Sequence, residues 1–259
     1  MISLQGQTTL ITGGSRGIGR AAALLLAEAG SDIAFNYACR EKEALEVKAE
    51  VEKRGRRCLA IRAQLAEPAE VRGMVERMVE AWGRIDGLVN NAGVWTYLEM
   101  RKLDPDVLKE TMEVNIEGVF HTVDAVVPHM RRQGRGWIVN IGSTAGVRGE
   151  AIHSHYAASK GAIHAATKSW AVEFAPWNIR VNCVAPGWVD TDMCTGVFSE
   201  TGFRESVRQS IPLKRIPPPE DIAGPVLFLA SDLARHVTGA IINVNGGSVL
   251  CGESQEKVN

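Results

Sequence analysis

The stretch Thr8-Thr-Leu-Ile-Thr-Gly-Gly-Ser-Arg-Gly-Ile-Gly19 joins a short apolar strand to a glycine-rich turn. An apolar helical run from Ala21 to Ala29 follows, and Gly30 closes it. A glycine turn between a strand and a helix lets the backbone approach a pyrophosphate at the positive helix end. Three residues separate Gly13 from Gly17, whereas the usual dinucleotide fingerprint has one. The context predicts a dinucleotide-binding turn, and a purely structural turn is the alternative.

Strand and helix patterns alternate regularly along the rest of the chain. We predict further strands at 32–37, 58–63, 85–89, 137–141, 179–185 and 240–244, and helices at 41–53, 67–82, 104–132, 156–176 and 219–230. This alternation predicts an α/β fold with a doubly wound parallel sheet of the Rossmann type, covered by helices on both faces. Ligands of such sheets bind beyond the carboxyl ends of the strands. The glycine turn, Asn90–Gly93, Ser143 and Pro186-Gly187 all fall there.

Composition indicates one globular domain over residues 1–259. The chain has 259 residues, 45% of them hydrophobic, and a net charge of −1, with no basic run that would favour nucleic acid or an anionic membrane. No apolar stretch has the length of a signal peptide or a membrane span. The cysteines are odd in number, scattered and without a C-x-x-C pair, which predicts reduced thiols in a cytoplasmic protein and no zinc site. They are Cys39, Cys58, Cys183, Cys194 and Cys251.

A polar constellation lies between Ile141 and Lys160. Tyr156 and Lys160 are four residues apart, so a helix places them on one face, and an ammonium beside a phenol lowers the pKa of the phenol. Ser143 follows an apolar strand, so its hydroxyl can reach the same edge. Together these groups suit the polarisation and protonation of a carbonyl oxygen. The Tyr-x-x-x-Lys pattern alone is weak, since a buried aromatic and a solvated charge would also produce it; the predicted cofactor turn makes it informative.

On these motifs the chain resembles the short-chain dehydrogenase/reductase family, in its single-domain branch, over nearly its whole length. The matching motifs, in order, are Thr12–Gly19, Asn90–Gly93, Asn115, Ser143, Tyr156-x-x-x-Lys160 and Pro186-Gly187. The stretch from Ile211 to Gly247 is similar to that of 3-oxoacyl-carrier-protein reductases and related carbonyl reductases. The resemblance implies an oxidoreductase that transfers hydride between a nicotinamide cofactor and a carbonyl or alcohol.

The resemblance also implies roles for single residues. Tyr156 would be the general acid in reduction, Lys160 would lower its pKa and hold the ribose, Ser143 would hydrogen-bond the substrate oxygen, and Asn115 would orient a water that relays protons to Lys160. The implied cofactor-binding residues are Gly13, Ser15, Arg16, Gly17, Ile18, Gly19, Asn36, Tyr37, Arg40, Gln64, Leu65, Asn91, Ala92, Gly93, Tyr156, Lys160, Pro186, Gly187, Val189 and Thr191.

The residues around the second strand favour NADPH over NADH. Relatives that prefer NAD usually end this strand with a carboxylate, whereas this chain reads Asn36-Tyr-Ala-Cys-Arg40. Arg16 in the glycine turn can reach the same place, and a guanidinium suits a phosphate. The chain departs from the family twice here, with Arg40 one position later than usual and Gln64 in place of the common Asp that contacts adenine.

The predicted substrate pocket is largely apolar. Trp95 and Tyr97 follow Asn90–Gly93, and residues 188–210 read as a mobile lid that contains Trp188, Met193, Phe198 and Phe203. We take Ser143, Trp95, Trp188 and Met193 as substrate-binding residues and expect a 3-oxoacyl thioester or a hydrophobic ketone. The alternatives are an NAD(P)-dependent alcohol or polyol (glucose-type) dehydrogenase and a dinucleotide-sensing protein without turnover. His153 and His155 form no ligand set, so we expect no metal.

The resemblance further implies a homotetramer, with a dimer as the alternative. An acyl carrier protein is a possible partner, although Pro176-Trp-Asn178 lacks the basic residue that carrier-protein reductases often have before the sixth strand. Arg131, Arg132 and Arg135 could supply a basic docking patch, and a solvated helix end explains them equally well.

Overall fold

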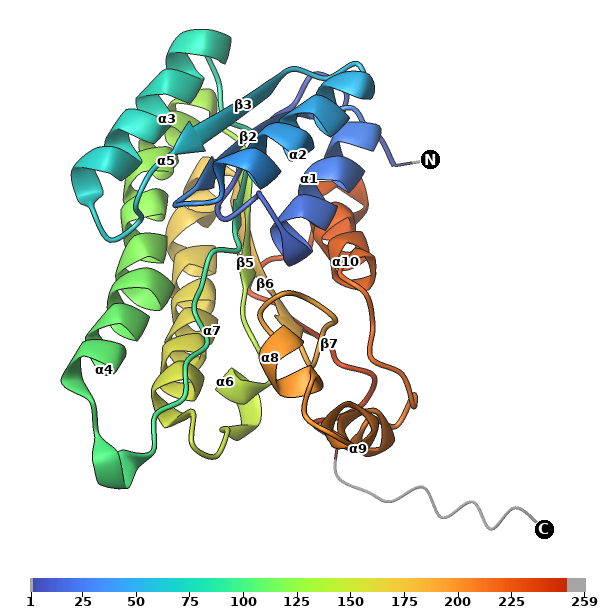
Figure 1. Cartoon of the computed structure of the whole chain (residues 1–259). Helices are drawn as coiled ribbons and strands as arrows, with labels where there is room; N and C mark the ends of the chain where they lie inside the picture. The colour runs from blue at the N-terminus through green and yellow to red at the C-terminus, as the bar shows by residue number, and fades with distance from the viewer. Residues whose placement is uncertain (1, 251–259) are drawn as a thin grey trace.

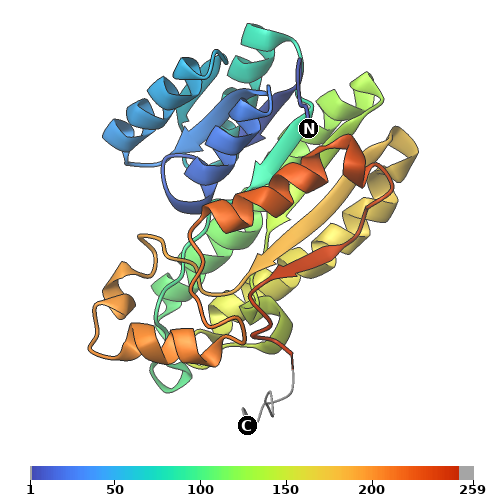
Figure 2. The same cartoon turned by 90° about the vertical axis from the view of Figure 1, so that its right-hand side faces the viewer.

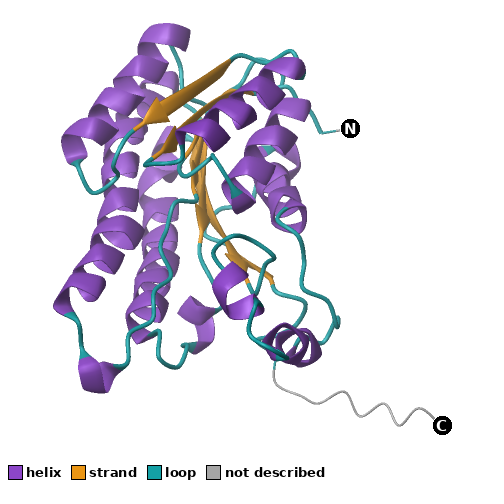
Figure 3. Ribbon diagram, viewed as in Figure 1, coloured by secondary structure: helices purple, strands orange, loops and turns teal. Residues whose placement is uncertain are grey.

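The computed structural model describes residues 2–250, which contain a seven-stranded parallel sheet with helices on both faces (Figure 1 and Figure 3). The strands are β1 (Thr8–Ile11), β2 (Asp32–Tyr37), β3 (Cys58–Arg62), β4 (Gly87–Asn90), β5 (Gly136–Ile141), β6 (Ile179–Pro186) and β7 (Ile241–Val244). Their spatial order is β3-β2-β1-β4-β5-β6-β7. The predicted doubly wound Rossmann-type fold is therefore confirmed, and each strand lies within two residues of its predicted bounds. The winding reverses between β1 and β4, which is where such sheets bind ligands.

Most helices of the described residues belong to the two outer layers. They are α1 (Gly17–Glu28), α2 (Glu41–Lys53), α3 (Pro68–Trp82), α4 (Pro105–Met112), α5 (Gly118–Gln133), α7 (Ser154–Phe174) and α10 (Glu220–Ala230). Helices α1, α2 and α10 bury their apolar residues with one face of the sheet, and α3, α5 and α7 with the other (Figure 1). Strands β1 and β2 are buried along their whole length, as expected for a sheet covered on both sides.

Three shorter helices lie at the carboxyl end of the sheet. They are α6 (Ala145–Arg148), α8 (Thr195–Phe198) and α9 (Phe203–Ser210). Figure 2 shows the segment with α8 and α9 standing apart from the main layers, beyond the ends of the strands. The predicted lid, residues 188–210, is therefore partly helical.

Two helix predictions need correction. Helix α1 begins at Gly17 and not at Ala21, so the last two glycines of the turn already belong to the helix, while Arg16 before it is still extended. The long helix predicted over 104–132 begins where expected, with the Asp104 carboxylate accepting the N–H of Asp106 at 2.9 Å. It is interrupted by a π-helical turn at Glu113–Glu117, which separates α4 from α5.

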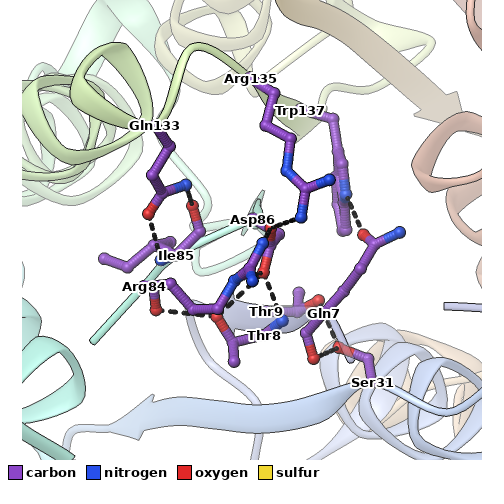
Figure 4. A network of polar contacts seen from close by, with 10 residues as sticks. All are labelled: Gln7, Thr8, Thr9, Ser31, Arg84, Ile85, Asp86, Gln133, Arg135 and Trp137. Atoms are coloured by element: carbon purple, nitrogen blue, oxygen red, sulfur yellow. Dashed lines mark hydrogen bonds and ion pairs between the residues drawn. The ribbon is translucent and has the colours of Figure 1, made fainter. Parts of the chain in front are cut away.

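A polar network ties β1, β4 and β5 together at the amino edge of the sheet (Figure 4). The buried carboxylate of Asp86 accepts the backbone N–H of Thr8 at 2.9 Å and the Nε–H of Arg84 at 2.8 Å, and it pairs with Arg135 at 3.3 Å. The Gln133 side chain accepts a hydrogen bond from the Ile85 N–H at 3.0 Å and donates one to the Ile85 carbonyl at 2.7 Å. Since ligands bind at the opposite edge of such sheets, this network is structural. Arg135, one of the three arginines of the predicted docking patch, pairs with Asp86 while its side chain stays 57% exposed.

No helix within residues 2–250 combines the length and the apolar character needed to cross a membrane. Cys39, Cys58, Cys183 and Cys194 are free thiols, and Cys251 lies outside the described residues.

Candidate active site

A cleft of about 490 Å³ opens at the carboxyl ends of the strands and contains almost every predicted site residue. It runs from the glycine turn and the end of β2, past Asn91–Gly93, to the loop after β5 and the start of the lid. Of the predicted catalytic, cofactor and substrate residues, only Gly19 and Asn115 do not line it. The structure thus brings together groups that lie as far apart in the chain as Gly13 and Thr191.

The glycine turn is held in shape by two asparagines. The Gly13 N–H donates to the side-chain oxygen of Asn36 at 2.8 Å, and the Asn36 amide donates to the Ala63 carbonyl at 2.9 Å. The Asn91 amide donates to the carbonyl oxygens of Thr12 and Gly13 at 2.9 and 3.1 Å. Asn36 and Asn91 therefore position the turn, with their side chains already engaged.

Gly19 lies behind the turn and keeps it compact. A Cβ at Gly19 would collide with the Gly13 carbonyl oxygen and with the Asn91 amide. Gly13 and Gly17 have positive φ angles of 65° and 52°, which favour glycine. The turn is thus a backbone cradle at the start of α1, which fits a dinucleotide pyrophosphate.

Two arginines face the outer end of the cleft, beyond β2. Arg16 pairs with Asp192 of the lid segment at 3.5 Å, and Arg40 pairs with Glu43 at 3.0 Å. All four side chains are well exposed, so neither pair is strong. No carboxylate lines the wall formed by the end of β2, where Tyr37 and Arg40 lie. This end of the cleft therefore presents two guanidinium groups whose carboxylate partners an anionic ligand can replace.

Ser143, Tyr156 and Lys160 line the same cleft. A hydrogen bond from Ser143 lowers the pKa of Tyr156, which places the hydroxyl beside the phenol. The Nζ atom of Lys160 lies 5.8 Å from the centroid of the Tyr156 ring. It donates to the carbonyl oxygen of Ile141 at 2.9 Å, so the buried ammonium is tied to the end of β5.

The expected lowering of the Tyr156 pKa by Lys160 is wrong for the chain alone. Burial raises the pKa of Tyr156 to about 12, and the carboxylate of Glu150 acts in the same direction. Burial also lowers the pKa of Lys160 to about 8, which weakens the charge it could apply to the phenol. In the chain by itself, withdrawal from water is the largest influence on the pKa of both groups.

Asn115 lies in the π-helical turn, buried behind the cleft. Its side-chain oxygen accepts the Val94 N–H at 2.8 Å, and its amide donates to the Val94 carbonyl at 2.9 Å and to the Ser159 hydroxyl at 3.1 Å. Both ends of the amide are thus engaged. The side chain fixes the segment after Gly93.

Aromatic rings form the wall beyond Tyr156. Trp95 and Trp188 line the cleft and meet edge to face, with ring centroids 5.7 Å apart. Met193 lines it as well. Phe198 and Phe203 of the predicted lid do not line it; they pack against Trp188 with centroids at 5.6 and 5.7 Å and support that ring. Tyr97 also lies outside the cleft and is 62% exposed.

Two charged residues of this wall were missed from the sequence. Arg148 at the end of α6 and Glu150 in the following loop both line the cleft. Burial raises the pKa of the Glu150 carboxyl, while His153, a hydrogen bond from Trp95 and Arg148 act in the opposite direction. The sequence could have indicated that Arg148 and Glu150 lie at the site, because both are in the segment between Ser143 and Tyr156 and both ends of that segment belong to the site. Within residues 2–250 no cluster of His, Cys, Asp and Glu is placed to hold a metal ion.

Comparison with known proteins agrees with this geometry. Residues 13–248 match the family model described as Enoyl-(Acyl carrier protein) reductase. The chain is similar to an L-rhamnose 1-dehydrogenase (NAD(P)(+)) from Sphingomonas sp. (strain SKA58), with 38% identity over 94% of this chain and 96% of that protein. It is similar to the 3-oxoacyl-(acyl-carrier-protein) reductase FabG of Staphylococcus epidermidis, with 39% identity over 94% of this chain and 99% of the relative.

A solved structure shows the same likeness in three dimensions. A gluconate 5-dehydrogenase from Burkholderia cenocepacia J2315, in complex with NADP and tartrate, superposes with a TM-score of 0.91. Its sequence is 32% identical, and the match covers 96% of this chain and 98% of that chain.

Proposed function

The chain belongs to the short-chain dehydrogenase/reductase family of oxidoreductases that act on CH–OH and C=O groups, and we propose that it reduces a ketone with NADPH. The substrate would be a 3-oxoacyl thioester or a hydrophobic ketone. The observation that carries this proposal is the meeting of Ser143, Tyr156 and Lys160 in one cleft with the glycine turn and an aromatic wall.

The residues of the cleft fit a nicotinamide dinucleotide, which supplies the hydride when bound. The glycine turn from Gly13 to Gly19 would hold the pyrophosphate, and Lys160 would hold the ribose. Tyr156 carries its proton at neutral pH, as any phenol does, and it lines the cleft with Ser143 beside it, so it would be placed to donate that proton at the carbonyl oxygen. The Ser143 hydroxyl beside it would orient the same oxygen.

The two arginines at the outer end of the cleft support NADPH over NADH. Arg16 and Arg40 are exposed, and each is held only by a surface ion pair that a phosphate can replace. The solved gluconate 5-dehydrogenase was found with NADP. Gln64 lines the cleft beside Leu65 and would contact the adenine through its amide.

The alternative function is oxidation of a polyol, as in the rhamnose- and gluconate-dehydrogenase relatives. The presence of Glu150 and Arg148 in the wall favours it, because hydroxyl groups need such partners. A dinucleotide sensor without turnover is less well supported, because the full Ser-Tyr-Lys set is present.

Residues 188–210 would close over the substrate as a lid. We further propose that the protein is a cytoplasmic homotetramer.

The test is a spectrophotometric panel with NADPH, NADH and their oxidised forms. Acetoacetyl thioester, aryl ketones and glucose are compared at matched concentrations, with acyl carrier protein and coenzyme A as thiol carriers. We expect ketone or thioester reduction with NADPH. Preferred oxidation of glucose would establish the polyol alternative, and tight NADPH binding without any turnover would favour the sensor. Faster reduction of the thioester on acyl carrier protein than of the same thioester on coenzyme A would support the carrier protein as a partner.

A further inference from the structure

Glu150 is a carboxylate in an otherwise aromatic part of the cleft. It lies in the loop between α6 and α7, and 21% of its side chain is exposed. It lines the same cleft as Tyr156, Trp95 and Trp188. The charge of Glu150 raises the pKa of Tyr156, so the carboxylate lies near the reacting end of the cleft.

The loop that holds Glu150 is fixed from two sides. The imidazole of His153 stacks on the Trp95 indole, with centroids 4.4 Å apart and planes 9° apart. The Leu98 N–H donates to the Ile152 carbonyl at 3.0 Å, which joins the loop to the segment after Trp95. Glu150 is therefore held at a defined place in the wall.

The Glu150 carboxylate lacks a strong ionic partner within residues 2–250. The nearest basic atom is Nδ1 of His153, at 4.0 Å from Oε1, and that nitrogen also lies 3.1 Å from the Ala151 carbonyl oxygen. No Lys or Arg nitrogen of the described chain comes within 4.0 Å of it. An ionised carboxylate offers several acceptor sites and no donor, and the hydrogen bond from Trp95 fills only one of them. A group in the cleft that donates a hydrogen bond would satisfy them.

We infer that Glu150 is a specificity-determining residue that accepts a hydrogen bond from a hydroxyl or protonated amine of the substrate. The apolar part of such a substrate packs on Trp95 and Trp188, and its donor group reaches Glu150 while its carbonyl lies at Tyr156. Ketones with a donor are therefore preferred over the same ketones without one, and a carboxylate in that place is repelled. This inference rests on the proposed function and narrows its substrate class.

The experiment compares three ketones of one skeleton, namely acetophenone, alpha-hydroxyacetophenone and para-(aminomethyl)acetophenone. Initial rates with NADPH give kcat/KM for the wild type, Glu150→Met and Glu150→Gln. Methionine keeps the length of the side chain and removes the acceptor; glutamine keeps an acceptor oxygen and removes the charge. Glu99→Met is the matched control, because Glu99 is 22% exposed in a neighbouring loop and does not line the cleft.

We expect the wild type to prefer at least one donor-bearing ketone over acetophenone. Glu150→Met should lose about 10-fold or more of that preference, which is a ratio of two kcat/KM values for one enzyme, as is usual for a lost hydrogen bond to a charged group. Glu99→Met should keep the preference. If Glu150→Gln also loses the preference for the donor-bearing ketone, the donor is a cation, because glutamine lacks the charge. If Glu150→Gln keeps the preference, the donor is a hydroxyl, because glutamine still offers an acceptor oxygen. Unchanged NADPH affinity in all variants shows that the cleft is intact.

A preference that is absent in the wild type, or the same in wild type and Glu150→Met, overturns the inference. In that case turnover of acetophenone or acetoacetyl thioester still supports the proposed function. Absence of turnover with every carbonyl compound refutes the proposed function itself, so the two failures are distinguishable.

Discussion

At the scale of single residues, burial controls the protonation of the site. The pKa of Tyr156 is raised to about 12 and that of Lys160 lowered to about 8, each chiefly because the charged form is withdrawn from water. The chain by itself therefore holds Tyr156 as a protonated phenol, but as a weaker acid than a free tyrosine. Ser143 beside the phenol is the local group that lowers its pKa.

Replacing Tyr156 by Phe tests this assignment. The ring remains and the transferable proton is lost, so we expect reduction to slow by about 10²-fold or more, the usual contribution of a general acid. Single-turnover rates with saturating NADPH measure the effect on the chemical step. Near-normal rates under these conditions would show that the proton comes from another group.

The depressed pKa of Lys160 predicts a pH-dependent stability. Its ordinary pKa of 10.5 falls to about 8 in the folded chain, so the folded state releases its proton earlier than the unfolded state. The cost of burying the charge is complete below pH 8 and disappears as the pH rises towards 10.5. Relative to Lys160→Met, the wild type should therefore gain stability between these values. Urea unfolding of the ligand-free proteins measures this, and a pH-independent difference would contradict it.

Arg16 should discriminate between the two nucleotides. Arg16→Ala removes the guanidinium at the outer end of the cleft, and we expect NADPH to bind about 10-fold or more weaker, as for a lost charged hydrogen bond, with NADH little affected. Nucleotide fluorescence titration measures both affinities. Arg20→Ala is the control, because Arg20 lies outside the cleft on the exposed side of α1. Equal kinetic efficiency of the wild type with both nucleotides would argue against NADPH preference.

At the scale of elements, the site depends on close packing of α6 on α7. A Cβ at Gly146 of α6 would lie 2.6 Å from the Lys160 carbonyl carbon and 2.7 Å from the Gly161 nitrogen. Such contacts with backbone cannot be relieved by a side-chain rotation. Glycine at this position thus lets the loop after Ser143 approach the helix that carries Lys160.

A pair of glycine substitutions tests this packing. Gly146→Ala should cost about 1–3 kcal/mol of unfolding free energy through overpacking and should also reduce turnover. Gly73→Ala, within α3 and with no atom within 4 Å of the added Cβ, should stabilise by about 0.5–1 kcal/mol. Denaturant unfolding compares the two. Equal effects of the two changes would show that the approach of α6 to α7 is not tight.

At the scale of the whole molecule, several large apolar side chains remain exposed on the helices of one layer. Phe120 on α5 is 46% exposed and Val172 on α7 is 77% exposed. Both helices lie on the same face of the sheet (Figure 1). These residues suit a contact between copies of the chain, in line with the proposed homotetramer.

Light scattering at micromolar concentration tests the assembly. We expect a tetramer, with a dimer as the alternative, and Val172→Glu should reduce the assembled mass because it places a charge in the contact. Leu45→Glu is the control, since Leu45 is 55% exposed on α2 of the other layer. A monomeric wild type would refute the proposal.

The pattern of the sequence was sufficient for the order of strands and helices and for the edge at which the site lies. Apolar runs and glycine or proline breaks are local signals, and right-handed parallel winding leaves one binding edge. Once the glycine turn and Tyr156-x-x-x-Lys160 were recognised, most of the residues of the cleft could be named.

The tertiary structure was needed for the properties that depend on neighbouring groups, namely the pKa values and the side-chain contacts of the site. The reversed direction of the Tyr156 pKa follows from burial, which no spacing reveals. Asn115 hydrogen-bonds to Val94, and Phe198 and Phe203 pack against Trp188 and do not line the cleft. Both arrangements depend on how distant segments pack. The entry of Glu150 into the cleft depends on the path of one short loop. Desolvation and side-chain contacts are set by neighbours far along the chain, so they exist only once the fold has brought those neighbours together.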